Sequence, residues 1–258
     1  MISEPVRIRV KGQWACFTRP EFKVERVSYP VITPSAARGI LEAILMKPIE
    51  KPETSKRDDK TGFRWRVLRL GIVKEGVSVP ILRNELKTDK IAYSGKAALP
   101  INISDGENSR TQRHSLILKD VEYLIDAVIE VPPQVQKFSR QFLIAKYHQM
   151  FLRRAERGQC FHRPYFGCRE FSCDFELALE AEPTNLNKDF GRMLRDFNFE
   201  PIWKHWPSGE ARPAKWETDN KKPISPTPHS FRARAEQGWI TVARIVDNSG
   251  KPEVEEVC

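Results

Sequence analysis

The sequence predicts an α+β fold in which strands alternate with two helices and short strands follow. Segments that alternate apolar and basic residues, such as 6–10 and 64–73, are typical of half-buried strands. Two segments, 36–45 and 138–157, carry apolar residues at the spacing of amphipathic helices. From about residue 187 the chain is rich in proline and tryptophan and holds a predicted hairpin.

In the first half of the chain, the strand that begins at 6–10 continues through 14–17, and prolines then end it. Ser35 is the predicted N-cap of the first helix, because a serine hydroxyl accepts a hydrogen bond from the free amides of a helix start. A charged loop is expected at 49–62. The strand at 64–73 follows, and its alternate residues give it one strongly positive face.

In the second half, residues 84–109 show no apolar period, and a mobile insertion is expected there. A basic stretch at 110–114 leads into a long predicted strand at 115–131, with a bulge expected near Asp120. Ser139 is the expected cap of the second helix, and Gly158 lies just past its end.

The segment 160–179 is aromatic and also predicted to be a strand, interrupted at Gly167, where a backbone bend or close approach is expected. A hairpin is predicted for 231–235 against 239–243. The order strand, helix, strands, helix, strand is compatible with a ferredoxin-like βαββαβ layout with a β appendage. We therefore expect one domain at 1–186 and a small C-terminal antiparallel β-sheet subdomain at 187–258.

The charge of the chain favours a polyanionic partner. Its 258 residues include 43 Lys and Arg against 34 Asp and Glu, which gives a net charge of +9. Basic surfaces bind phosphates by releasing counterions, although a basic protein without such a partner fits the charge equally well. No apolar run is long enough to span a membrane and no signal-peptide pattern opens the chain, so a cytoplasmic location is expected.

The cysteines do not predict a metal site or a disulfide framework. An odd number, five, argues against disulfides in a cytosolic chain. Cys160, His162, Cys168 and Cys173 lie close together, but their spacing matches no common zinc site. We expect neither a metal nor a cofactor.

Four segments resemble one protein family. Residues 29–44 (YPVITPSAARGILEAI) and 158–171 (GQCFHRPYFGCREF) are similar to the d-type Cas5 proteins of subtype I-C CRISPR systems, and the second is the more specific. Residues 110–114 (RTQRH) and 227–233 (TPHSFRA) resemble the same family.

The resemblance implies a fold and a function. It implies a ferredoxin-like, RRM-related N-terminal domain with a small C-terminal β-sheet subdomain. It also implies an endoribonuclease that cuts the CRISPR repeat RNA at the base of its hairpin without metal. The protein would then stay on the 5′ handle of the crRNA, among the other subunits of the subtype I-C Cascade complex. A non-catalytic subunit that only holds the handle, or a binder of double-stranded DNA, are the alternatives.

The chemistry of a metal-free cut needs proton transfer and charge stabilisation. The ribose 2′-OH attacks the adjacent phosphate, which leaves a 2′,3′-cyclic phosphate and a free 5′-OH. Histidine suits the proton transfer near neutral pH, and lysine or arginine suits the phosphorane charge.

The catalytic motif of the family is a Lys–His pair on the second helix and a tyrosine at the end of the first. Lys146 matches the lysine, Tyr147 stands where the histidine is expected, and His148 follows. Leu45 stands in place of the tyrosine. Residues two apart on a helix point about 200° apart, so Lys146 and His148 share a face only if the helix is distorted. A core-facing His148 is the alternative.

Further residues are candidates for RNA binding, each with a plainer alternative. The stripe that Lys146 forms with Arg153 and Arg157 is either a phosphate track or a solvated face. His114 is a reserve general base beside two arginines, or part of a solvated strand. Aromatic side chains after the second helix either stack on bases or pack. The candidates are Arg38, Arg110, Arg113, His114, Arg153, Arg157, His162 and Tyr165.

Overall fold

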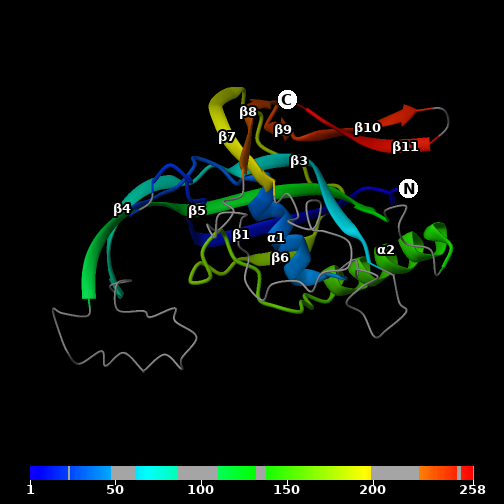
Figure 1. Ribbon diagram of the computed structural model, residues 1–258, viewed down its shortest axis with the longest axis horizontal. Coiled ribbons are helices and arrows are strands. Elements are labelled where there is room, and N and C mark those ends of the chain that lie inside the picture. Colours follow the sequence, from blue (N-terminus) through cyan, green and yellow to red (C-terminus); the bar gives the residue numbers. More distant parts are fainter. Residues whose placement is uncertain are drawn as a thin grey trace, which may run out of the picture.

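The computed structural model describes residues 1–22, 24–47, 62–86, 110–131, 138–198, 227–248 and 251–257 (Figure 1). These residues form a mixed α+β fold, in which two helices lie on one face of a curved, mostly antiparallel sheet. The predicted fold class is confirmed at this level. The expected loop at 49–62 and the expected insertion at 84–109 lie outside the described residues, apart from residue 62 and residues 84–86.

The centre of the sheet consists of four antiparallel strands in the order β6-β1-β5-β3. They are β1 (Val6–Ala15), β3 (Arg64–Lys74), β5 (Arg110–Glu130) and β6 (Asp174–Leu177). A short strand, β2 (Arg26–Val27), pairs with β5 in parallel. The predicted strands at 6–10, 64–73 and 115–131 are therefore confirmed.

The long strand β5 changes partners along its length. Its second half lies between β1 and β3, whereas its first half pairs with β4 (Val77–Leu86). We call this two-stranded extension the β4–β5 arm; it projects from the body in Figure 1. Asp120, at the change of partner, has a positive φ of 57°, near the expected bulge. The expectation of a loop from residue 84 is wrong for 84–86, because pairing with β5 holds these residues in β4.

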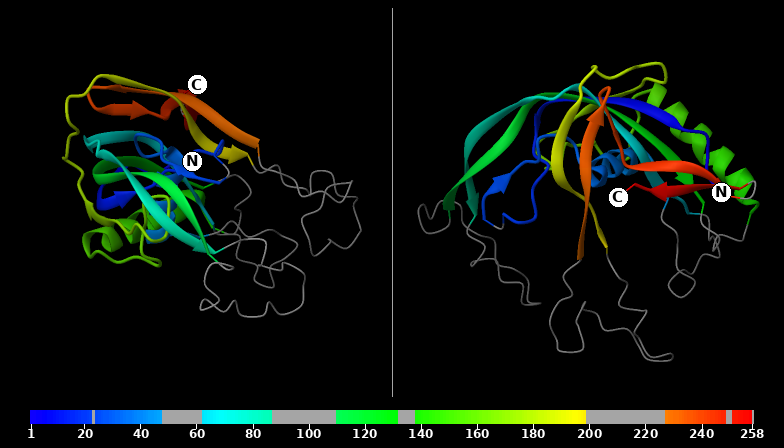
Figure 2. Two further views of the ribbon diagram at one scale, coloured as in Figure 1. Left: turned by 90° about the vertical axis from the view of Figure 1, so that its left-hand side faces the viewer. Right: turned by 90° about the horizontal axis from the view of Figure 1, so that it is seen from above.

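The C-terminal strands continue the same sheet. β9 (Trp239–Thr241) pairs with β3, and β8 (Thr227–Glu236) and β7 (Lys188–Asn198) follow it outward. The predicted hairpin is confirmed as β8–β9. Figure 2 shows β7 and β8 crossing the top of the molecule. Hydrogen bonds between β3 and β9 thus join the two predicted domains, and a boundary near residue 187 stays a prediction. A separate two-stranded sheet consists of β10 (Ala243–Asn248) and β11 (Lys251–Glu256).

The first helix, α1 (Pro34–Ile44), begins two residues earlier than its predicted cap allows. Thr33 is the N-cap, and its Oγ1 accepts a hydrogen bond from the amide of Ala36 at 3.3 Å. The prediction of Ser35 as cap is wrong, because Pro34 takes the first helical position, where proline lacks only an unpaired amide. The apolar side of α1 packs on β3 and β7.

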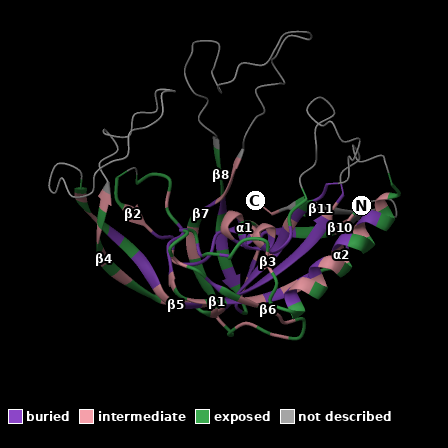
Figure 3. Cartoon of the chain, turned by 90° about the horizontal axis from the view of Figure 1, so that it is seen from below, coloured by how far each residue is buried: buried purple, intermediate pink, exposed green. Residues whose placement is uncertain are grey.

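The second helix, α2 (Arg140–Glu156), follows the predicted bounds closely. Leu143, Tyr147, Phe151 and Ala155 form its buried stripe, which packs toward β5 and β6. Figure 3 shows this buried side of α2 turned toward the sheet. Gly158 ends the helix region with a φ of 61°. Among the described residues no helix is long and apolar enough to cross a membrane.

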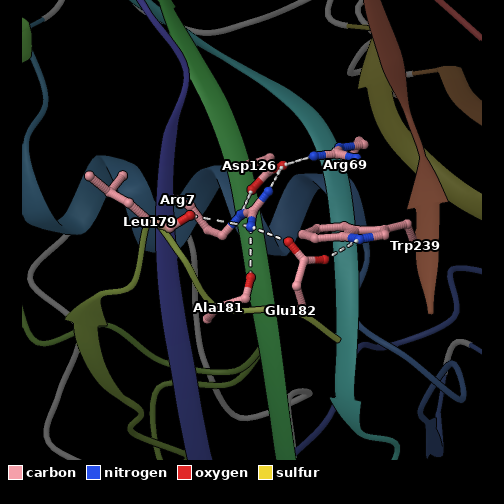
Figure 4. Close-up of polar contacts among 7 residues, drawn as sticks. All are labelled: Arg7, Arg69, Asp126, Leu179, Ala181, Glu182 and Trp239. Carbon is pink, nitrogen blue, oxygen red and sulfur yellow. Dashed lines mark hydrogen bonds and ion pairs between the residues drawn. The ribbon is translucent and has the colours of Figure 1, made fainter. Parts of the chain in front are cut away.

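The sheet face turned away from α1 is held by a buried carboxylate. Asp126 of β5 accepts hydrogen bonds from Arg7 of β1 and Arg69 of β3, each at 2.6 Å (Figure 4). Both guanidinium groups lie over the ring of Trp239, 4.7 and 4.3 Å from its centroid. The Trp239 indole also donates to Glu182 at 3.4 Å. Asp126 therefore partly neutralises the predicted positive face of β3. The contacts of Trp239 with the two arginines hold β9 against the central strands.

Candidate functional site

A groove of about 750 Å³ opens where both helices end. One wall comes from the last turns of α1 and the residues after it. The opposite wall comes from the segment that follows α2, and one α2 arginine lies between them. We call this the helix-end groove. Its lining residues are Gly39, Glu42, Ala43, Leu45, Met46, Lys47, Arg154, Phe161, His162, Arg163, Tyr165 and Arg169.

The last carbonyl groups of α1 hold the walls together. A helix leaves its final carbonyls without partners inside the helix. Here the oxygen of Ala43 accepts from the amides of Phe161 and His162, at 2.9 and 3.0 Å. The oxygen of Ile44 accepts from Nη1 of Arg154 at 2.6 Å. The position of His162 is thus set by the end of α1.

The segment after α2 is tied to the end of β1. Phe166 is fully buried, and its carbonyl accepts from the amide of Cys16 at 3.0 Å. Gly167 has a φ of 79°, and a Cβ at this position would lie 2.0 Å from the Cys16 oxygen. The expected interruption at Gly167 is confirmed, whereas the strand expected on either side of it is wrong except for β6, because this close approach imposes a turn. The turn projects Tyr165 into the groove.

Positive charge dominates the helix-end groove. Lys47 and Arg169 form no ion pair within the described part of the chain, whereas Arg163 pairs with Asp174 outside the groove. Among the described residues of the lining, the one carboxyl is that of Glu42. Burial raises the pKa of Glu42, while Arg38 at 3.5 Å opposes the shift. The groove therefore offers several cations to an anionic ligand.

Exposed aromatic rings stand beside these cations. Phe161 is 71% exposed, and its ring centroid lies 4.4 Å from that of His162. Tyr165 is 38% exposed. Unstacked bases of RNA stack on such rings, while neighbouring cations bind the phosphates. Of the predicted RNA-binding residues, His162 and Tyr165 lie together in this groove.

The predicted catalytic residues of α2 point in three directions. Lys146 is exposed, whereas Tyr147 is only 3% exposed and packs on Phe63, with ring centroids 4.9 Å apart. His148 is half-buried, and its Nε2 atom is buried without a hydrogen-bond partner in the described structure. Burial lowers the pKa of His148, and Glu4 partly offsets this. Lys146 and His148 lie about 200° apart around α2, since the helix is continuous between them.

The other predicted RNA-binding residues lie on three further surfaces. Arg153 and Arg157 are exposed on the Lys146 side of α2. Arg113 on the β4–β5 arm lies 3.6 Å from Glu85 and donates to the carbonyl of Val24 at 3.1 Å. Arg110 and His114 are exposed on the same arm.

Arg38 lies outside the helix-end groove. Its guanidinium forms a bidentate ion pair with the carboxylate of Asp196 in β7, in which Nη2 and Oδ1 lie 3.1 Å apart. Its charge is therefore offset by a carboxylate. The structure does not bring Arg38, Arg113 and Lys146 into one site.

Sequence reasoning missed four cations of the groove. Lys47, Arg163 and Arg169 gave no periodic signal. Arg154 had a periodic signal. It lies three residues after Phe151 of the buried stripe, and this spacing places Arg154 at the edge of the core. Leu45, at the position where the resemblance implies a tyrosine, is fully buried, and its carbonyl accepts from the indole of Trp65 at 2.9 Å.

Comparison with known proteins identifies the family. The Cas5d model, described as CRISPR-associated protein (Cas_Cas5), matches residues 6–243. A CRISPR pre-crRNA endoribonuclease Cas5d from Thermus thermophilus is 38% identical over 238 residues, which cover 92% of this chain and 90% of that protein. The protein of the same name from Mannheimia succiniciproducens is 36% identical over 251 residues, covering 92% and 94%.

A solved structure shares the fold. The crystal structure of a CRISPR-associated protein superimposes with a TM-score of 0.56 at 20% identity, covering 93% of this chain and 92% of that one. The family match spans both helices and the sheet. The chain belongs to the Cas5d family of CRISPR-associated proteins.

Proposed function

We propose that this chain is a pre-crRNA endoribonuclease that holds the base of the CRISPR repeat hairpin in the helix-end groove. The observation that carries the proposal is the meeting in one cavity of His162, exposed aromatic rings and two cations, Lys47 and Arg169, that form no ion pair among the described residues. Both curated relatives are named for this activity. The groove supplies the group types that a metal-free cut requires.

The proposed reaction is a transesterification without metal. The 2′ oxygen loses its proton and attacks the adjacent phosphorus, the bond from phosphorus to the 5′ oxygen breaks, and the 5′ oxygen takes a proton. The products are a 2′,3′-cyclic phosphate and a 5′-OH. A histidine can transfer the protons, and neighbouring cations can stabilise the negative charge of the phosphorane.

Within the groove we assign proton transfer to His162, because it is exposed and held by the Ala43 carbonyl. Lys47 is placed to offset phosphate charge, since no carboxylate neutralises it among the described residues. Tyr165 lines the same cavity as Leu45 and supplies the phenol that Leu45 lacks. Its hydroxyl would orient the scissile phosphate.

The α2 residues take supporting roles in this proposal. Lys146 matches the lysine of the family and anchors RNA along the flank that also carries Arg153 and Arg157. Tyr147 has a structural role in the core and supports the position of Lys47. Its ring packs on Phe63, and the amide of Phe63 donates to the carbonyl of Lys47 at 3.1 Å. Catalysis by Lys146 and His148 is the competing assignment, and it requires RNA on both flanks of α2.

We further propose that the chain stays on the 5′ handle of the crRNA within a Cascade complex. Support comes from the path β1-α1-β3-β5-α2-β6 and the strand order β6-β1-β5-β3, which we interpret as a ferredoxin-like unit. The β4–β5 arm, with Arg110, Arg113 and His114, is the surface we assign to the handle or to neighbouring subunits.

A second candidate function is handle binding without cleavage. The buried Leu45 favours it, because the family tyrosine is absent from the end of α1. The same groove would then hold RNA without cutting it.

Incubation of the purified chain with repeat RNA and excess EDTA tests the proposal. We expect a single cut at the hairpin base, a 2′,3′-cyclic phosphate on the upstream product and a 5′-OH on the downstream product. RNA with a 2′-deoxyribose before the scissile phosphate should bind but resist cutting. Tight binding without product would establish the second candidate instead, and cutting only with added divalent metal would contradict the mechanism.

A further inference from the structure

Glu42 is the one acidic side chain among the described residues that line the helix-end groove. It lies near the end of α1, and its side chain is 38% exposed. Four cations share the lining with it, but none of them forms an ion pair with Glu42 within the described part of the chain. A carboxylate in this position repels phosphate, so phosphate binding alone does not account for it.

The partner of Glu42 on its own helix is shared with a second carboxylate. Nε of Arg38 lies 3.5 Å from Oε1 of Glu42, while both Nη atoms of the same guanidinium bind Asp196. The Glu42 carboxylate accepts no hydrogen bond from the described residues. Burial raises the pKa of Glu42, and the charge of Asp196 adds to the rise although Arg38 opposes it. A half-buried carboxylate without donors is stabilised by a ligand that brings N–H groups to it.

The other wall of the groove presents aromatic rings on which a base can stack. Phe161 is 71% exposed and Tyr165 is 38% exposed, and both line the cavity with Glu42. An unpaired base that stacks on such a ring keeps its Watson–Crick edge free for hydrogen bonds. The cavity of about 750 Å³ lies within the range of about 300–1,000 Å³ that is typical of ligand pockets, so it has room for one unstacked nucleotide.

The donor pattern of the four bases selects guanine. A carboxylate only accepts hydrogen bonds, and its two oxygens lie side by side. Guanine presents two adjacent donors, N1–H and N2–H, on its Watson–Crick edge. Cytosine and adenine present one amino group beside a bare ring nitrogen, and uracil presents one N–H between two carbonyls, so each would set an acceptor against the second oxygen.

We propose that Glu42 selects an unpaired guanine beside the scissile phosphate by accepting hydrogen bonds from its N1–H and N2–H groups. The inference rests on the proposed function, since that function places the RNA in the helix-end groove. Glu42 then determines sequence specificity, whereas the cations of the same groove bind phosphates of any sequence.

Glu42→Gln tests the proposal, with Glu156→Gln as the matched control. Glu156 is the last residue of α2, is exposed and does not line the groove, so its replacement removes the same charge elsewhere. Guanine, or inosine, which lacks the N2 amino group, is placed in turn at each unpaired position beside the base of the repeat hairpin. Each RNA carries a 2′-deoxyribose before the scissile phosphate, so that affinity is measured without cutting. At one position the wild-type chain should bind the guanine form about threefold to thirtyfold more tightly.

The ratio of the two affinities decides the role of Glu42, because a general change in charge alters the binding of both RNA forms alike. Glu42→Gln should bind the guanine and inosine forms with nearly equal affinity, while Glu156→Gln should keep the wild-type preference. A preference that Glu42→Gln retains, that both variants lose, or that the wild-type chain lacks at every position overturns the proposal. Cutting of the all-ribose hairpin in EDTA is measured separately. Absence of product there would end the proposed function, while the binding preference would still decide the role of Glu42.

Discussion

Arg154 of α2 donates from Nη1 to the carbonyl oxygen of Ile44 at 2.6 Å and so joins the end of one helix to the end of the other. One residue earlier, the carbonyl of Ala43 receives the amides of Phe161 and His162. Two consecutive carbonyls of α1 therefore position the segment that carries His162 and Tyr165. The geometry of the proposed cleavage site depends on this junction.

Replacing Arg154 should loosen that junction. Arg154→Gln removes a charge-assisted hydrogen bond, and we expect a loss of about 1.5–3 kcal/mol in the free energy of unfolding. Cleavage should fall as well, because His162 loses its support. Denaturant unfolding measures the stability. Arg153→Gln is the control, since Arg153 is exposed and its loss should change stability by less than about 0.5 kcal/mol. Equal losses of stability in the two variants would contradict the role of the junction.

Two glycine replacements should act in opposite directions. Gly167→Ala places a Cβ 2.0 Å from the Cys16 oxygen at a φ of 79°, so it should destabilise the chain by at least about 1–3 kcal/mol. Gly39→Ala lies in α1 with open space around the new Cβ, and it should stabilise by about 0.5–1 kcal/mol. Thermal unfolding distinguishes the two. A stable Gly167→Ala variant would show that the turn is not tied to β1.

Asp126, whose carboxylate binds arginines of both β1 and β3, should contribute more to the free energy of unfolding than any surface ion pair. Asp126→Asn leaves Arg69 without its counter-ion and Arg7 with only the exposed Glu182, both beside a buried amide, and we expect a loss of about 3–5 kcal/mol. Asp174→Asn breaks the exposed pair with Arg163 and should cost less than about 1 kcal/mol. Comparable unfolding midpoints for the two variants would disprove the structural role of Asp126.

The thiol of Cys168 should be ionised at neutral pH. A hydrogen bond from Cys16 and the nearby Arg26, 3.3 Å from Sγ, lower its pKa from an ordinary 9.0 to about 6, although burial opposes them. Its folded-state pKa is depressed, so its contribution to stability is absent below pH 6 and grows as the pH rises toward 9. The pKa of Cys16 moves upward, mainly through its hydrogen bond with Cys168, so the pair carries one negative charge.

Ultraviolet thiolate absorbance measures this titration, with Cys168→Ser as the baseline. Arg26→Gln should move the Cys168 titration to higher pH, because a positive donor to the sulfur is lost. An unchanged titration would show that Arg26 does not stabilise the thiolate.

The parts of the fold with clear periodicity were predictable from sequence. β1, β3, β5 and both helices follow patterns of period two or near 3.6, which arise from one buried face. β4 was missed because Pro80 and polar residues hide its period, and its strand geometry comes from pairing with β5. Gly167 marked an interruption of the strand predicted at 160–179, but the extent of the turns around Phe166 was not predictable, since the contact that bends them lies about 150 residues away at Cys16. Contacts so distant in sequence leave no local signal beyond the glycine itself.

The candidate site was predictable only where one segment carries it. His162 and Tyr165 were predicted within the family-like segment 158–171, and the structure places both in the helix-end groove. Lys47 and Arg154 come from other elements and join the groove through the junction of the helices. The opposite flanks of Lys146 and His148 followed from helix geometry alone. The pairing of Arg38 with Asp196 did not, because it links α1 to β7.

We propose that RNA is cut in the helix-end groove, with His162 transferring protons. The most direct measurement is the single-turnover cleavage rate and the affinity for repeat RNA of His162→Ala, beside His148→Ala. We expect His162→Ala to slow cutting by about 10²–10⁴-fold with little change in affinity, whereas His148→Ala should keep a near-normal rate. A normal rate in His162→Ala together with loss of cutting in His148→Ala would contradict it.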